Sequence, residues 1–213
     1  MRTIDIRGIT NMELVRGGTS EWYWATAYVH GDLYEAEELF RQKNSVQSNR
    51  LYLIHYPDGM VYEPVLPVDG QYLGYPVFDG ESVVLLVVNF TESAIHILRF
   101  LHQQEKTQEV VRLPLSAVKD CYNLILHPSP LSLTRQPNDG TFEIIWPEQI
   151  RFAISSRETL NFRDGDKLYF SIWYEDPDYR EETLVRSAPD GTLLCRSSGD
   201  IRIMPNRERW LIK

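Results

Sequence analysis

The sequence predicts a mainly β protein made of antiparallel sheets, in about four repeated units of three or four strands each. The first observation is a set of Asp-Gly pairs, which stand at Asp58-Gly59, Asp69-Gly70, Asp79-Gly80, Asp139-Gly140, Asp164-Gly165 and Asp190-Gly191. Most of them lie between apolar runs of strand length. Asp-Gly in that position indicates a hairpin, because both residues tolerate the positive φ angles that a tight turn requires. The aromatic content of 12% also suits strands, where flat rings pack on a pleated surface.

The second observation is a shared layout in four segments, which begin at residues 17, 79, 119 and 164. In each, a turn leads into an apolar strand, and a second hairpin turn follows later. A recurrence of roughly 40 to 50 residues with three or four strands is typical of propeller blades, and the first segment is longer because it contains a predicted helix. The segments share little sequence identity, so a β-sandwich of two packed sheets, or two smaller β domains, is the alternative. The terminal segments 2–9 and 201–213 are expected to pair and close a unit, and residues 1–213 to form a single all-β domain.

One short helix is predicted near residues 32–43. Asp32 is suited to the N-cap, and Glu35 stands three residues later, where a capping box requires a glutamate. Leu33, Ala36 and Phe40 fall on one face at helical spacing. We therefore expect this face to be buried and the helix to cover an open end of the core; a contact surface for a partner is the alternative.

The composition disfavours several classes of partner. The formal charge of −8 argues against nucleic acid, whose binding depends on Lys and Arg neutralising phosphates. The longest apolar run, 83–88, is far too short for a membrane span. The first residues lack a signal-peptide core, and Cys121 and Cys195 are too few for a disulfide framework. A soluble, acidic, cytoplasmic protein with two buried cysteines is expected.

No sequence pattern indicates catalysis, a metal or a cofactor. A Gly-x-Ser-x-Gly nucleophile motif, a phosphate-binding loop and a dinucleotide-binding motif are all missing from the sequence. The histidines stand at no ligand spacing, and they are His30, His55, His96, His102 and His127. We therefore predict no catalytic residues, no cofactor and no metal site; a site assembled from distant strands is the alternative.

The candidate binding residues are Trp22, Trp24 and Tyr28. In a strand, alternate side chains point the same way, so these three share a face with Thr26. An exposed aromatic face would offer a stacking platform to a sugar ring or a hot spot to a protein partner. A buried one would be core, which is the usual fate of large aromatic residues.

These observations predict a non-enzymatic binding or interaction module, whose ligand is an unknown protein or carbohydrate. Two alternatives belong to other classes. A carbohydrate-active hydrolase would use paired carboxylates in a deep pocket. A structural subunit of a larger assembly would carry a sizeable exposed apolar patch.

Overall fold

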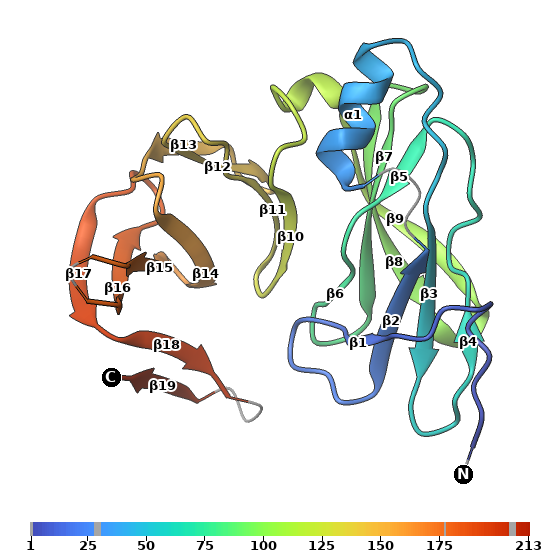
Figure 1. The fold of residues 1–213 in the computed structure, drawn as a ribbon, viewed down its shortest axis with the longest axis horizontal. Coiled ribbons are helices and arrows are strands. Elements are labelled where there is room, and N and C mark those ends of the chain that lie inside the picture. Colours follow the sequence, from blue (N-terminus) through green and yellow to red (C-terminus); the bar gives the residue numbers. More distant parts are fainter. Residues whose placement is uncertain (1, 28–30, 177, 205–207) are drawn as a thin grey trace. The chain divides into compact units, whose positions relative to one another are not determined.

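The computed structural model describes residues 2–27, 31–176, 178–204 and 208–213 (Figure 1). The protein is mainly β, with 50% of residues in strands and 7% in helices. The strands form four antiparallel sheets of four or five strands and one two-stranded hairpin. Neighbouring strands in each sheet are also close in the chain. The predicted fold class, with about four units of antiparallel strands, is confirmed.

The first sheet has the order β1-β2-β3-β4, made by β1 (Glu13–Leu14), β2 (Trp22–Ala27), β3 (Arg50–His55) and β4 (Val61–Tyr62). Its two long strands pair along their whole length, from Trp22 opposite His55 to Ala27 opposite Arg50. That register sets His55 at the end of β3, next to the turn that leads to β4.

The second sheet contains a long strand that is almost entirely buried. Its path is β5-β7-β8-β9, with β6 also paired to β7, and it is formed by β5 (Gln71–Leu73), β6 (Val77–Phe78), β7 (Val83–Asn89), β8 (Ala94–Leu101) and β9 (Lys106–Pro114). Every residue of 83–88 is buried, because β7 is a central strand covered on both faces. Two short 3-10 helices follow β8 and β9, namely η1 (His102–Gln104) and η2 (Leu115–Ala117).

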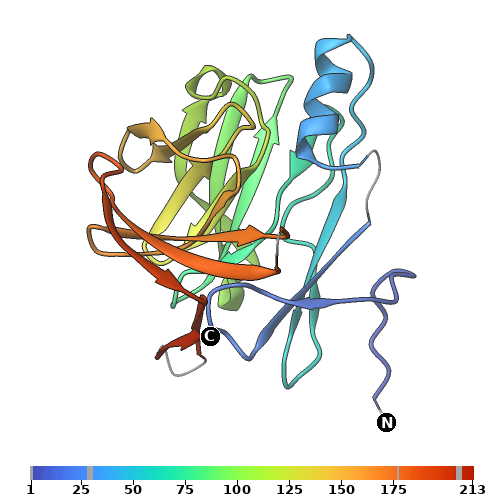
Figure 2. The same cartoon turned by 60° about the vertical axis from the view of Figure 1, so that its left-hand side comes forward.

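In the remaining two sheets the strands also follow one another in chain order, as β-meanders. The third sheet consists of β10 (Leu124–Pro128), β11 (Leu131–Arg135), β12 (Thr141–Trp146) and β13 (Ile150–Ala153). The fourth consists of β14 (Glu158–Asp164), β15 (Lys167–Tyr174), β16 (Arg180–Ser187) and β17 (Leu193–Ser198). The chain ends in the hairpin of β18 (Asp200–Ile203) and β19 (Arg209–Ile212) (Figure 2).

Five of the six predicted Asp-Gly turns connect two antiparallel strands, and all five glycines have a positive φ; the pairs are Asp58-Gly59, Asp79-Gly80, Asp139-Gly140, Asp164-Gly165 and Asp190-Gly191. Asp69-Gly70 is the exception, because it lies between β4 and β5, which belong to different sheets. Gly191 needs to be glycine for two reasons. Its φ is +73°, and an added Cβ would lie 2.2 Å from the Phe152 ring. Only glycine fits there without displacing the ring.

Two expectations about the units are wrong. The strands predicted to open three of them, in 21–29, 83–90 and 168–174, are preceded in their sheets by one or two strands. In the first two sheets these leading strands have only two or three residues, too few for a recognisable apolar run. The terminal segments do not close a unit either: residues 2–9 contain no strand, and β18 pairs with β19.

The predicted helix is present as α1 (Leu33–Arg41), beside β5 (Figure 1). Asp32 is its N-cap, and the full capping box with Glu35 is formed. Leu33 and Ala36 are buried as expected, but Phe40 is 38% exposed. The described part of the chain contains no helix that is both long and apolar enough to cross a membrane.

A polar residue one turn before Phe40 holds the helix to a neighbouring loop. Glu37 is buried and accepts a hydrogen bond from the backbone N–H of Cys121 and one from Arg41. Arg41 in turn donates to the carbonyl of Lys119. These bonds tie α1 to the loop before β10, while Phe40 stacks on the ring of Phe90 with its outer face in solvent.

The chain divides into two compact units, Met1–Pro128 and Ser129–Lys213. The core of the first unit includes Trp22 and Trp24, packed with residues of β3 and β7. The core of the second unit is centred on Phe142 and Phe170. The single-domain organisation, and the propeller or sandwich arrangement of the sheets, stay predictions.

Candidate functional site

The first unit contains a cavity of about 280 Å³. Five of its lining residues are aromatic: Trp24, Tyr34, Tyr72, Tyr75 and Tyr122. A volume of this size lies just below the range of about 300–1,000 Å³ that is typical of small-molecule pockets. The cavity therefore has room for roughly one ring.

The walls of the cavity come from several elements. β2 contributes Trp24, and the segment after β5 contributes Tyr75, whose ring meets the indole edge-on at 5.2 Å between centroids. The first turn of α1 contributes Tyr34, which makes a similar edge contact with Tyr122 at 5.2 Å. Edge-to-face pairs fix the orientation of the rings, so the cavity walls are preorganised.

The polar groups of the cavity are largely engaged by the protein itself. Asn49 is buried and exchanges two hydrogen bonds with the backbone of Leu73, at 2.7 and 2.8 Å. Among the described lining residues Asp32 is the only carboxylate, and it accepts the helix-capping bond from the Glu35 N–H at 3.0 Å. Neither side chain is arranged for proton transfer to a ligand.

Cys121 also lines the cavity, and it is 1% exposed. Burial, followed by the charge of Glu37, raises the pKa of this thiol far above its usual value. The thiol is thus protonated at neutral pH, and it is the thiolate that reacts as a nucleophile. The expectation of two buried cysteines is wrong for Cys195, which is exposed on β17.

The predicted binding residues occupy different environments. Trp22 and Trp24 are 6% and 7% exposed, and both belong to the core of the first unit, as the alternative interpretation of this face expects. Trp24 also lines the cavity. Tyr28 lies outside the described residues. A role of the three in binding a ligand stays a prediction.

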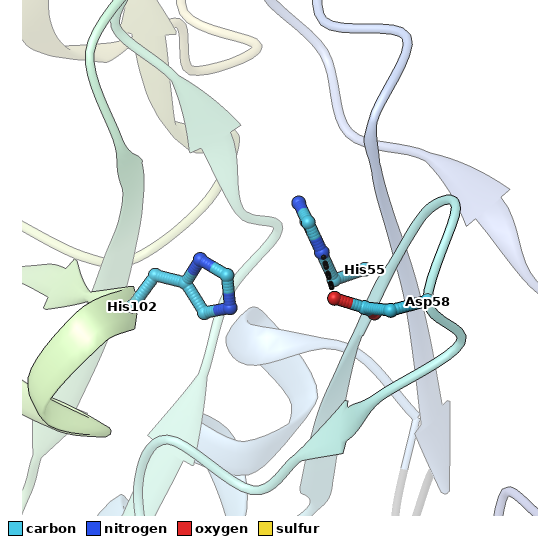
Figure 3. Close-up of side chains that lie close together, drawn as sticks. All are labelled: His55, Asp58 and His102. Atoms are coloured by element: carbon cyan, nitrogen blue, oxygen red, sulfur yellow. Dashed lines mark hydrogen bonds and ion pairs between the residues drawn. The ribbon is translucent and has the colours of Figure 1, made fainter.

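A second cluster of functional groups joins two histidines with one aspartate, His55, Asp58 and His102. One potential ligand atom from each residue lies within 4.8 Å of those of the other two. His55 ends β3, Asp58 stands in the turn before β4, and His102 opens η1 after β8. Figure 3 shows the His102 ring turned toward the other two side chains.

The hydrogen bonds of this cluster are well defined. Nδ1 of His55 is 2.8 Å from Oδ2 of Asp58, and Nε2 of His102 is 2.8 Å from the hydroxyl of Tyr62. The backbone N–H of Met60 and the His55 side chain lower the pKa of Asp58, so this carboxyl is an anion at neutral pH. Burial and the Asp58 charge raise the pKa of Tyr62, which keeps its proton.

The indole of Trp22 packs against both imidazoles of this cluster. Its ring centroid lies 4.6 Å from that of His55 and 5.0 Å from that of His102. The two imidazoles are themselves 4.5 Å apart. The sequence shows that His55 and Asp58 are three residues apart across a turn, but it gives no signal for His102. The approach of His102 depends on how the first two sheets pack.

The chain was compared with models of known protein families and with curated proteins, and it matches none of them.

Proposed function

We propose that the protein is a non-enzymatic binding module that holds one small, uncharged ring, of which a single sugar residue is the preferred case, in the aromatic cavity. The observation that carries the proposal is the composition of the cavity wall. Five aromatic residues surround a space of about 280 Å³, and the one carboxylate among the described lining residues already caps a helix.

Aromatic faces favour uncharged rings over anions, because they bury apolar surface and leave a ligand's hydroxyl groups to find partners at the rim. A glycoside hydrolase instead needs two carboxylates facing each other across the bond that is cleaved. The cavity lacks that pair among its described residues, and its thiol is held protonated. These features support binding over hydrolysis.

The test measures binding of methyl glycosides and of uncharged aromatic compounds by saturation-transfer NMR, followed by calorimetry on the compounds that bind. The key variant is Tyr75→Ala, since this side chain is 51% exposed and can be removed without opening the core. We expect the affinity to fall about tenfold, which corresponds to about 1.4 kcal/mol of binding free energy. Tyr179→Ala, which removes an exposed tyrosine outside the cavity, should bind as the parent does.

The proposal would be contradicted if no compound in the panel showed saturable binding, or if the parent and Tyr75→Ala bound with equal affinity. Release of product from a chromogenic aryl glycoside would favour the hydrolase instead.

A subunit role in a larger assembly is a second candidate, favoured by exposed apolar side chains in the last strands. Several residues of β17 to β19 are 48–52% exposed, namely Leu193, Leu194, Ile203, Trp210 and Ile212. Apolar surface of this kind is commonly covered by a partner. Light scattering should then show a defined oligomer, and a monomer at high concentration would refute this role.

A further inference from the structure

We propose that His55, Asp58 and His102 form a binding site for one divalent transition-metal ion, of the type represented by Zn²⁺. The site is separate from the aromatic cavity, because none of the three residues lines that cavity. It supplies two ring nitrogens and one carboxylate oxygen, all within 4.8 Å of one another.

The spacing of the three donors fits an ion after a small adjustment. Zinc bonds of about 2.0–2.2 Å in tetrahedral geometry place ligand atoms about 3.3–3.6 Å apart. Nδ1 of His55 and the Asp58 oxygen are already at 2.8 Å, and they would separate when an ion replaces the proton between them. Asp58 can follow this movement because its side chain is 47% exposed and sits in a turn.

The chemistry of the donors selects the class of ion. Imidazole nitrogen is a preferred ligand of zinc, copper and nickel, whereas calcium and magnesium prefer sites made of oxygen alone. Three protein ligands leave a fourth position for water or another small ligand.

The surroundings support a metal site in two ways. The Trp22 indole packs against both imidazoles, so neither ring can swing into the core. The Tyr62 hydroxyl bonds to Nε2 of His102 and holds that ring in the orientation seen in Figure 3. Contacts of this kind limit the rotation of a side-chain ring. At the same time His55 and Asp58 reach solvent, so an ion has access.

The experiment titrates ZnCl₂ into tag-free, chelator-treated full chain by isothermal calorimetry. We expect one tight equivalent per chain for the parent protein. Asp58→Asn should weaken it by more than about tenfold, because even outer partners of metal ligands contribute that much. This variant keeps the Oδ1 atom that accepts the Met60 N–H at 2.9 Å, so the turn is preserved. His102→Ala should weaken binding at least as strongly.

The matched control is His96→Ala. His96 is 16% exposed, as His55 is, and its Nδ1 also lies 2.7 Å from a carboxylate oxygen, that of Glu109. It belongs to no three-donor cluster among the described residues. His96→Ala should therefore bind zinc as the parent does.

X-ray absorption at the zinc edge gives a second measurement, and two imidazoles per ion are expected. Three results would overturn the proposal: no stoichiometric binding by the parent, unchanged affinity in Asp58→Asn, or a zinc environment without two imidazoles. If His102→Ala does not fold, Asp58→Asn and the absorption spectrum decide alone.

Discussion

Acidification should destabilise the protein through His127, a residue of β10 whose side chain is buried. The residue is 8% exposed. Burial, followed by the positive charge of Arg16, lowers the pKa of His127 from 6.5 to about 4. The native protein therefore keeps this imidazole neutral over a pH range in which the unfolded chain protonates it.

The sign and size of the effect follow from proton linkage. A lowered pKa in the folded state gives a contribution that is complete above pH 6.5 and is lost as the pH falls toward about 4. The full loss corresponds to about 3 kcal/mol, and the part between about pH 7.5 and about pH 5 to about 2 kcal/mol. The ordinary carboxylates of the chain titrate mostly below this window.

The assay compares the parent with His127→Gln, which has no proton to take up at this position. Urea unfolding at both pH values gives the free energy of each protein, in buffer with a chelator. The parent should lose about 2 kcal/mol more than the variant between the two conditions. Equal losses would refute the reasoning, as would an NMR titration in which the His127 ring protonates near its ordinary pKa.

Two further predictions concern a turn and the helix. Gly191→Ala should lower the free energy of unfolding by more than about 2 kcal/mol, because its Cβ meets a ring 2.2 Å away; Gly165→Ala, with a positive φ but open space, should cost about 1 kcal/mol. If urea unfolding gave the two variants similar losses of stability, the backbone angle alone would account for the cost. Phe40→Asp should cost only about 1 kcal/mol, because the residue is 38% exposed, whereas Ala36→Asp at 0% exposure should cost about 3 kcal/mol or more. The reverse order in thermal unfolding would place Phe40 in the core.

Local features of the fold could be predicted from the sequence because their causes are local. The Asp58-Gly59 turn depends on one positive φ angle, and the Asp32 cap depends on a partner three residues away. The alternation in β2 is equally local, and it correctly separates Trp22 and Trp24 from Ala25, which packs in a different cluster.

What could not be predicted depends on contacts between distant segments. Helical periodicity places Phe40 with Ala36, but the bond from the Cys121 N–H draws Glu37 inward instead, and periodicity contains no information about that partner. The approach of His102 to His55 joins the end of β8 to the end of β3, in two different sheets. Only the packing of the first unit determines it.

The meander order of the sheets has a consequence for how the chain acquires its structure. Each ladder joins segments that are close in sequence, as in the fourth sheet, where β14 to β17 occupy 158–198 without a crossover. Closing such short loops costs little entropy, so low contact order speeds formation. During synthesis, all strands of one sheet are made before the first strand of the next sheet. Few strand edges therefore stay unpaired until a distant segment has been synthesised.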